Sequence, residues 1–434
     1  MVLPQTGKQH VSISARQIGK IIPTEFGLFY LDIVRSTINR NKKVFLLIDE
    51  SGKIEGGVEG AVWRNKYIFH SESEGIPPST NLYFLHEILD AQEWSLNDAY
   101  NVAKEILVKT VDFRDKNYYD IVVSWSAYTW LRGFFHKNVN LYVLGFPGTG
   151  KSQVLKFVKY FARYPVDYEP LAQKSYKWAI NNTLGIICID EAEYINKTTA
   201  SRLRKYHETE IFEQRVVGLP LIGLTAIDLR VDAPLALAAT HVPPDIAFMQ
   251  RGLIIHMEKG NPEIKDVSQI PLIDQTRISF AKSVLVNWKR IYDSAIFVCN
   301  YANELNLDER VKDLAIPLAT VLHSVGLDYT MPFKYAERSF REASYTTIRG
   351  TVLALSILEL EKHVREVGDK FIVPIETVFN VIAKTAARFG LKKDKMLYLA
   401  QYFFSGGVVK FVEGKLCYLF DKRTFKSMVE QLKV

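Results

Sequence analysis

The spacing of hydrophobic residues changes several times along the chain, and each change predicts a different kind of element. Near the N-terminus, short apolar runs between Gly- and Pro-containing turns predict strands; the runs are Phe26–Leu31, Val44–Ile48 and Ala61–Phe69. Residues 96–139 have helical periodicity, with Ser95 or Asn97 as the N-cap. Residues 141–258 alternate short apolar runs with helical patterns, which is typical of βαβ units. We therefore expect an α/β fold with a mainly parallel sheet.

The C-terminal part of the chain carries two further patterns. Residues 273–365 are helical by periodicity, and residues 370–434 predict two helices followed by two strands. One face of the first helix, Pro374–Ala387, carries Val378, Val381, Ile382 and Thr385. Gly390 ends that helix, Lys392–Phe404 form the second, and Val408–Val412 and Leu416–Phe420 form a hairpin. This order predicts a winged helix, either as a DNA-binding unit or as a structural cap.

These patterns predict four domains, which is more than the two or three that length alone favours. A strand-rich N-terminal domain covers 1–115, an α/β core 116–258, a helical domain 259–365 and the winged helix 370–434.

Composition narrows the class of protein. With 48% hydrophobic and 24% charged residues among 434, whole-chain disorder and a fibrous protein are excluded. We find neither an apolar run of the ~18–20 residues that would span a bilayer nor a signal-peptide core in the polar N-terminus. Cys188, Cys299 and Cys417 lie far apart, without metal-ligand spacing or a disulfide framework. The expectation is a soluble cytoplasmic protein without a membrane partner.

Charge is distributed unevenly. The net charge is +7, and residues 370–434 hold 12 basic and 5 acidic residues, so the whole excess lies in this segment. Such a concentration of positive charge is typical of a nucleic-acid contact, although basic tails also act as solubilising segments. The expected DNA contacts there are Lys392, Lys393, Lys395, Lys410 and Lys415.

An acidic, glycine-rich stretch at residues 49–60 superficially resembles a calcium-binding loop. It lacks the glycine at the sixth position and the final glutamate that such a loop requires. We therefore expect a solvated hairpin turn.

The stretch Leu141–Ser152 contains the strongest motif, G-x-x-x-x-G-K-[ST], between an apolar run and a helical pattern. Glycines let backbone N–H groups surround phosphate oxygens, the lysine reaches the β- and γ-phosphates, and the serine hydroxyl ligates Mg²⁺. The motif predicts a site for ATP and Mg²⁺. Its expected residues are Gly145, Pro147, Gly148, Thr149, Gly150, Lys151 and Ser152.

A second apolar run, Leu184–Ile189, ends in two carboxylates. Because parallel strands end at one edge of a sheet, Asp190 and Glu191 should lie beside the phosphate loop. Asp190 is expected to hold Mg²⁺ through water, and Glu191 to polarise the attacking water. An isolated Asp-Glu pair would otherwise be a solvated turn.

Two later residues complete the expected catalytic set. Thr240 follows the apolar run Pro234–Ala239, expected between the two motif strands, where it can sense the γ-phosphate. Arg251 precedes another apolar run, Leu253–His256. It is either a finger inserted into the neighbouring subunit's ATP site or a surface arginine in a salt bridge.

The order of these motifs resembles that of AAA+ ATPases, and in detail the clade with a β-hairpin before sensor 1, which includes the minichromosome maintenance (MCM) helicases. Across roughly residues 120–365, the similar segments are Gly145–Val158 (Walker A), Gly185–Glu191 (Walker B), Glu213–Ala226 (hairpin), Ala238–Thr240 (sensor 1), Gln250–Ile255 (Arg finger) and Thr347–Arg349 (sensor 2). Only 39 positions separate Lys151 from Asp190, a compactness similar to that of plasmid and viral replicative helicases.

The resemblance implies a ring, expected to be a hexamer, that hydrolyses ATP to translocate along or unwind DNA. Residues 259–365 would be its helical lid and Arg349 its sensor 2. The sequence departs from the family in three ways: Thr240 replaces an asparagine, Leu221 replaces the hairpin-tip lysine, and residues 1–115 do not match its N-terminal domain. Arg215 and Arg230 are the nearby basic residues that would contact DNA instead.

Three functions remain open at this point. A replicative DNA helicase or translocase of an archaeal or mobile-element genome is favoured by the hairpin and the basic C-terminal segment. A protein-remodelling or regulatory ATPase and a restriction-type DNA translocase are the alternatives.

Overall fold

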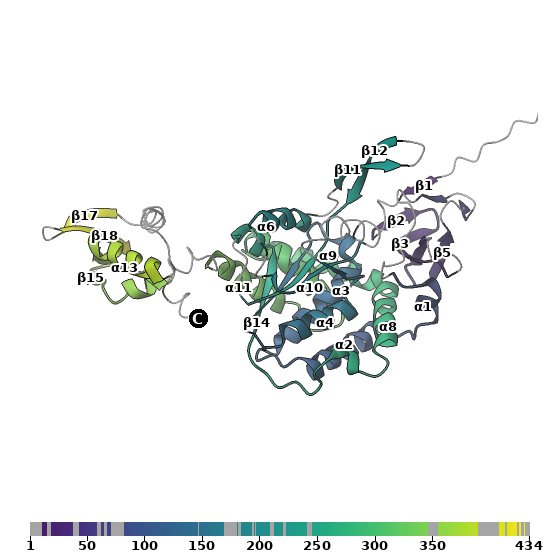
Figure 1. Cartoon of the computed structure of the whole chain (residues 1–434), viewed down its shortest axis with the longest axis horizontal. Helices are drawn as coiled ribbons and strands as arrows, with labels where there is room; N and C mark the ends of the chain where they lie inside the picture. The colour runs from purple at the N-terminus through teal and green to yellow at the C-terminus, as the bar shows by residue number, and fades with distance from the viewer. Residues whose placement is uncertain are drawn as a thin grey trace, which may run out of the picture. The chain divides into compact units, whose positions relative to one another are not determined.

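The computed structural model describes residues 11–14, 19–37, 43–58, 62–64, 67–70, 82–145, 147–168, 180, 184–192, 195, 197–208, 212–219, 223–240, 245–345, 355–388, 408–412, 415–422, 425–426 and 429. The chain forms two compact units (Figure 1). Unit 1 comprises residues 1–243 and 247–340, and unit 2 comprises residues 244–246 and 341–434. The expected division into four domains stays a prediction.

The N-terminal segment is rich in strands, as its apolar runs predict. A four-stranded antiparallel sheet contains β2 (Ile21–Thr24), β3 (Gly27–Arg35), β4 (Lys43–Asp49) and β5 (Ile54–Val58), in that order. A three-stranded sheet has the order β1 (Val11–Ser14), β7 (Tyr67–His70) and β6 (Val62–Trp63). The side chains of β3 and β4 are largely buried, and they share one hydrophobic core with the helices that follow.

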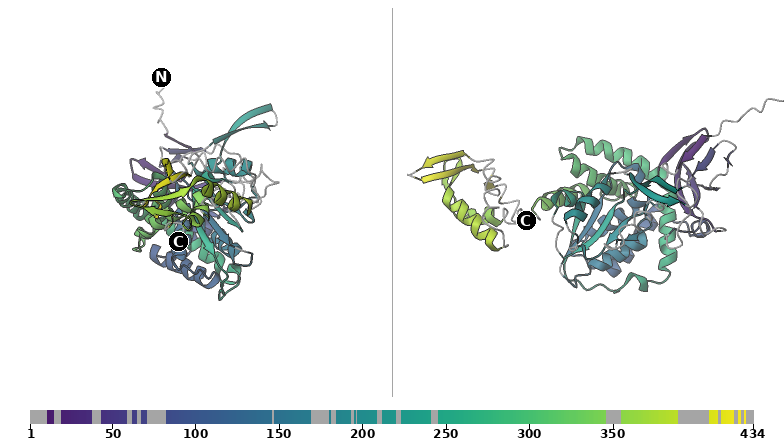
Figure 2. Two further views of the ribbon diagram at one scale, coloured as in Figure 1. Left: turned by 90° about the vertical axis from the view of Figure 1, so that its left-hand side faces the viewer. Right: turned by 45° about the horizontal axis from the view of Figure 1, so that its top comes forward.

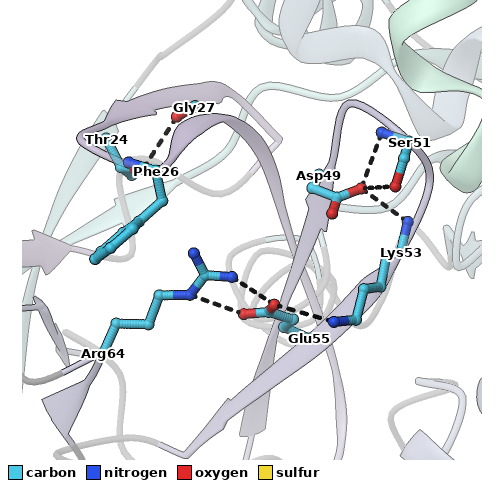
Figure 3. Close-up of polar contacts among 8 residues, drawn as sticks. All are labelled: Thr24, Phe26, Gly27, Asp49, Ser51, Lys53, Glu55 and Arg64. Atoms are coloured by element: carbon cyan, nitrogen blue, oxygen red, sulfur yellow. Dashed lines mark hydrogen bonds and ion pairs between the residues drawn. The ribbon is translucent and has the colours of Figure 1, made fainter.

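Residues 50–53 of the acidic stretch form the turn of a hairpin, as expected, but residues 54–58 continue as strand β5 and not as part of the turn. Asp49 Oδ1 accepts hydrogen bonds from the Ser51 N–H at 2.9 Å, the Ser51 hydroxyl at 2.6 Å and the Lys53 N–H at 2.9 Å (Figure 3). These bonds keep the pKa of Asp49 below its usual value, although burial opposes the shift. On β5, Glu55 pairs with Arg64, which follows β6 of the three-stranded sheet, at 2.5 Å. The carboxylates thus have protein partners of their own.

Unit 1 contains a group of helices, one of which is almost entirely buried. They are α1 (Leu85–Asp90), α2 (Leu96–Thr110), α3 (Asn117–Trp130), α8 (Ile273–Val286), α9 (Trp288–Glu304), α10 (Glu309–Ser324) and α11 (Met331–Tyr345). Ser95 caps α2, since its hydroxyl accepts a hydrogen bond from the Asp98 N–H at 3.1 Å. Twelve of the 14 residues of α3 are buried, because α2, α4 (Lys151–Phe161), α8 and α10 pack around it.

Five parallel strands form the central sheet of unit 1. Its strands are β8 (Asn140–Gly145), β9 (Val166–Asp167), β10 (Ile187–Ile189), β13 (Leu235–Ala239) and β14 (Gly252–Met257). They lie in the order β14-β8-β13-β10-β9, and every adjacent pair is parallel. The expected parallel sheet is confirmed, and β13 lies between the two motif strands, as predicted. Helix α4 packs against β8 and β13.

A separate hairpin is inserted between β10 and β13 along the chain. It follows α6 (Lys197–Leu203) and a short 3-10 turn, and consists of β11 (Phe212–Leu219) and β12 (Gly223–Arg230). In Figure 1 and in the left-hand view of Figure 2, the hairpin stands off the five-stranded sheet as a two-stranded ribbon. Its tip, which includes Leu221, lies outside the described residues.

Unit 2 has its own small core. The antiparallel order is β15 (Arg365–Val367), β16 (Lys370–Pro374), β18 (Lys415–Asp421) and β17 (Val408–Val412), with α13 (Ile375–Arg388) beside the sheet. The predicted helix face is confirmed, since Val378, Val381, Ile382 and Thr385 are buried. Strands β15 and β16 were not predicted. The second predicted helix lies outside the described residues, so the winged helix stays a prediction.

No helix within the described ranges is both long enough and apolar enough to cross a bilayer.

Candidate active site

Three motifs that are far apart in the sequence meet at the carboxyl edge of the central sheet. Ala239 pairs with Leu144, so Thr240 follows directly beside Gly145 at the end of β8. Ile189 pairs with Leu237, which places Asp190 at the same edge, one strand further away. In open α/β sheets, ligands bind outside the carboxyl ends of the strands.

The phosphate loop depends on glycine for its shape. Gly148 and Gly150 have φ angles of +77° and +92°, a region that other residues rarely adopt. A Cβ on Gly145 would lie 2.6 Å from the Met257 carbonyl oxygen and 2.8 Å from Thr149 Oγ1. Met257, the last residue of the neighbouring strand β14, therefore lies directly against Gly145, a contact that the motif alone does not reveal.

The loop leads directly into a helix N-terminus, where unpaired backbone N–H groups favour anions. Gly150 is the N-cap of α4, and Lys151 and Ser152 form its first turn. The Lys151 ammonium donates a hydrogen bond to the Gly145 carbonyl at 2.7 Å, so it already lies over the loop. Ser152, Pro147 and Gly148 are exposed, whereas Thr149 is buried.

The two carboxylates follow a fully buried strand and are themselves exposed. Glu191 has a φ of +52°, which is uncommon for any residue other than glycine. Its N–H donates to Asp190 Oδ1 at 3.0 Å, which holds the neighbouring carboxylate in place. Strained backbone of this kind collects at functional sites, so the outlier supports a role for Glu191.

Arg251 lies at the opposite, amino edge of the sheet. Its carbonyl accepts a hydrogen bond from the Asn140 N–H at the start of β8, whereas the phosphate loop begins at Gly145. Five residues of strand separate the two, roughly 16 Å at ~3.3 Å per residue. Arg251 is therefore remote from the phosphate loop of its own chain.

Arg251 has polar partners at the amino edge, among them a carboxylate. The side chain is half-buried; its Nε donates to the Ala247 carbonyl at 3.1 Å, and Nη1 lies 3.7 Å from Glu208 Oε1. Burial lowers the pKa of its guanidinium, Glu208 opposes the shift, and Arg204 and Arg310 add to it. Glu208 also pairs with Lys137.

Sequence reasoning missed the buried polar groups of this amino edge. Asp32 on β3 forms a two-pronged ion pair with Arg163, which follows α4; Nη1 and Oδ2 are 2.7 Å apart. Arg132 donates to Asp232 Oδ2 at 3.2 Å. All four side chains are at most 5% exposed, and the partners are 100 or more positions apart in sequence. No local motif could have signalled pairs at such separation.

The expected DNA contacts are only partly within the described residues. In the hairpin, Arg215 pairs with Ile227 and Arg230 with Phe212, so these arginines occupy register positions on opposite faces. Lys410 and Lys415 are exposed on the β17–β18 hairpin of unit 2. Outside the described residues lie Arg349, Lys392, Lys393 and Lys395.

The residues at the carboxyl edge fit a nucleoside triphosphate with its cation. The glycine cradle, the α4 N-terminus and Lys151 suit phosphates, and the Ser152 hydroxyl and Asp190 supply hard oxygen ligands of the kind that Mg²⁺ takes. Within the described ranges, no three His, Cys, Asp or Glu side chains cluster as a metal site.

No protein-family model matches the chain, and no curated protein matches it. Among solved structures, it is similar to the SCCmec type IV Cch active helicase, with 11% identity, coverage of 94% of this chain and 79% of that one, and a TM-score of 0.43. A full-length MCM homolog from Methanopyrus kandleri is 11% identical, with coverage of 74% of this chain and 73% of that one and a TM-score of 0.37. The NrS-1 C-terminal region is 10% identical, with coverage of 90% of this chain and 96% of that one and a TM-score of 0.41. Because these TM-scores lie below 0.5, the function proposed for this chain rests on its own residues.

Proposed function

We propose that the chain is an ATP-driven DNA helicase or translocase that works as a ring. The observation that carries the proposal is the meeting of Gly145–Ser152, Asp190–Glu191 and Thr240 at one edge of a parallel sheet. A phosphate cradle beside an exposed carboxylate and a hydroxyl is an arrangement for hydrolysis rather than for binding alone.

Each side chain has a distinct role in this proposal. Lys151 binds the β- and γ-phosphates, while Ser152 and Asp190 hold the cation. Bound Mg²⁺ would neutralise negative charge on the phosphates. The Glu191 carboxylate accepts a proton from water, and the Thr240 hydroxyl orients that water.

The position of Arg251 supports assembly into a ring, of which a hexamer is the expected form. Since this arginine lies at the edge remote from its own phosphate loop, a second copy must supply the arginine that each site uses. An arginine that acts in trans contributes ~10³–10⁵ in turnover in related phosphoryl-transfer sites. Arg349 is proposed to contact the nucleotide as sensor 2.

Two features favour DNA as the partner that the motor acts on. The β11–β12 hairpin projects from the sheet, and in the chain it follows Glu191 after α6 and a short 3-10 turn. The segment 370–434 holds the whole positive excess of the chain. In this proposal, hydrolysis at Glu191 moves the hairpin, and Arg215 or Arg230 contacts the DNA phosphates.

ATP hydrolysis with and without single-stranded or duplex DNA tests this proposal. We expect DNA to stimulate turnover, and strand displacement on a forked duplex then separates a helicase from a pure translocase. A rate of ATP hydrolysis that DNA does not change, but that an added unfolded protein increases, would favour the protein-remodelling alternative. Absence of any ATP hydrolysis would refute the proposal.

A further inference from the structure

The β17–β18 hairpin of unit 2 exposes an unusual amount of apolar surface. Phe411 is 72% exposed, the largest fraction for any large hydrophobic side chain in the described ranges. Phe411 pairs with Leu416 across the hairpin, and Val409 pairs with Tyr418, so these residues share one face. Leu416 and Val409 are also exposed, whereas Tyr418 is buried in the core against α13. We call Val409, Phe411 and Leu416 the wing surface.

A cavity continues the wing surface toward α13. It has a volume of about 490 Å³, within the ~300–1,000 Å³ of small-ligand sites. Its lining residues are Pro374, Ile375, Glu376, Phe379, Asn380, Lys415 and Leu416. The walls combine an aromatic ring and aliphatic groups with one amide, one carboxylate and one ammonium.

The charge around this surface suits a polyanion. Lys415 lines the cavity beside Leu416. Lys410 pairs with Cys417, so it occupies a register position on the other face of the hairpin from Phe411. Both lysines are exposed, and neither forms an ion pair with any residue that the structure describes. Lys422, by contrast, pairs with Glu366 at 2.7 Å. Glu376 is the one acidic side chain of the cavity lining.

We propose that unit 2 binds single-stranded nucleic acid, with an unpaired base stacked on Phe411 and a neighbouring base in the cavity beside Phe379. Lys415 contacts a phosphate beside the cavity, and Lys410, on the edge strand β17, contacts another phosphate from the other face of the hairpin. Asn380 and Glu376 face the polar edge of the second base. An intact duplex covers the faces of its bases, so an exposed aromatic ring gains little from it, whereas a single strand offers every face for stacking. This inference rests on the proposed function and specifies the form of DNA that the protein holds.

The test uses the full chain and fluorescence anisotropy with three labelled probes: a 20-nucleotide thymidine strand, the same strand with abasic sites, and a duplex of equal length. Phe411→Ala should weaken binding of the thymidine strand about tenfold, within the range for loss of one base–aromatic stack. Affinity for the abasic strand should stay unchanged. Leu272→Ala is the matched control, because Leu272 is 69% exposed but lies in unit 1.

Salt dependence separates the lysines from the aromatic ring. Phe411→Ala should keep the slope of log affinity against log salt, while Lys410→Gln with Lys415→Gln should reduce it by about 0.7 for each lost contact to a single strand. Phe411→Trp should preserve thymidine binding, because it keeps a stacking surface.

Two results would overturn the inference: unchanged thymidine binding by Phe411→Ala, or an equal loss on the abasic strand. In either case the proposed function survives as long as the wild-type protein binds DNA and DNA stimulates its ATP hydrolysis. A wild-type protein that binds none of the three probes would refute both.

Discussion

The two edges of the central sheet are built in opposite ways. At the carboxyl edge, Pro147, Gly148 and Ser152 of the phosphate loop are exposed, and so are Asp190 and Glu191. At the amino edge, ion pairs are buried: Asp32 with Arg163 and Arg132 with Asp232. Both edges hold charges, but only the amino edge neutralises them within the protein interior.

The amino edge therefore contributes to stability, whereas the carboxyl edge is arranged for ligand chemistry. A buried charge without a partner is costly, so the amino edge requires both members of each pair. The carboxyl edge instead keeps N–H groups and carboxylates available to a ligand, at the cost of a strained backbone at Glu191. Substitutions at the carboxyl edge should therefore impair ATP binding or hydrolysis, whereas substitutions at the amino edge should lower the free energy of unfolding.

The largest expected effect is at the carboxyl edge. Lys151→Ala should abolish ATP binding, because the phosphates lose the ammonium group that pairs with them. The midpoint of its urea unfolding should stay near that of the wild type. Glu191→Gln should keep binding but slow turnover by ~10²–10⁴. Lys156→Ala is the control, since Lys156 lies on the same helix and pairs with Asp266 at 2.5 Å instead. Near-normal turnover in Glu191→Gln would show that another residue is the base.

The converse effect is expected for the buried pair at the amino edge. Asp32→Asn leaves the Arg163 charge buried without its partner, which should lower the free energy of unfolding by about 3–5 kcal/mol. Burial alone would lower the pKa of Arg163, but Asp32 outweighs burial and raises it. Urea unfolding followed by tryptophan fluorescence measures the loss, since Trp130 lies beside Arg163.

Glu105→Gln is the control for this substitution, because it removes an exposed pair with Lys109 that is worth a few tenths of a kcal/mol. If Asp32→Asn and the control had the same free energy of unfolding, the buried pair would not stabilise the fold.

A smaller, pH-dependent effect is expected at His207. Burial, with Arg251 close by, lowers its pKa from 6.5 to about 4. Between those values the unfolded chain binds a proton that the folded protein does not, so stability falls as the pH falls. From pH 7 to pH 5 the loss amounts to about 2 kcal/mol. In His207→Gln, the free energy of unfolding should fall by about 2 kcal/mol less between pH 7 and pH 5 than in the wild type. If the fall is the same in both proteins, His207 is not the source of this pH dependence.

The same contrast explains what the sequence could predict. The phosphate loop, Asp190–Glu191 and Thr240 are each read from a short local pattern, and the alternation of strands and helices brings them to one edge. The pairs Asp32–Arg163 and Arg132–Asp232 join distant segments, and their charged side chains look like solvated residues in sequence. Strands β15 and β16 were missed because Arg365–Pro374 is short and carries no clear alternation.

The central claim is that each active site combines the carboxyl edge of one subunit with the amino edge of another. Mixing Arg251→Ala with Glu191→Gln protein and measuring ATP hydrolysis in the presence of DNA tests it most directly. Each variant alone should turn over ATP slowly, and the mixture should recover activity, because some interfaces then join an intact Glu191 to an intact Arg251. A wild-type rate in Arg251→Ala alone, or no recovery between two slow variants that do co-assemble, would contradict the claim.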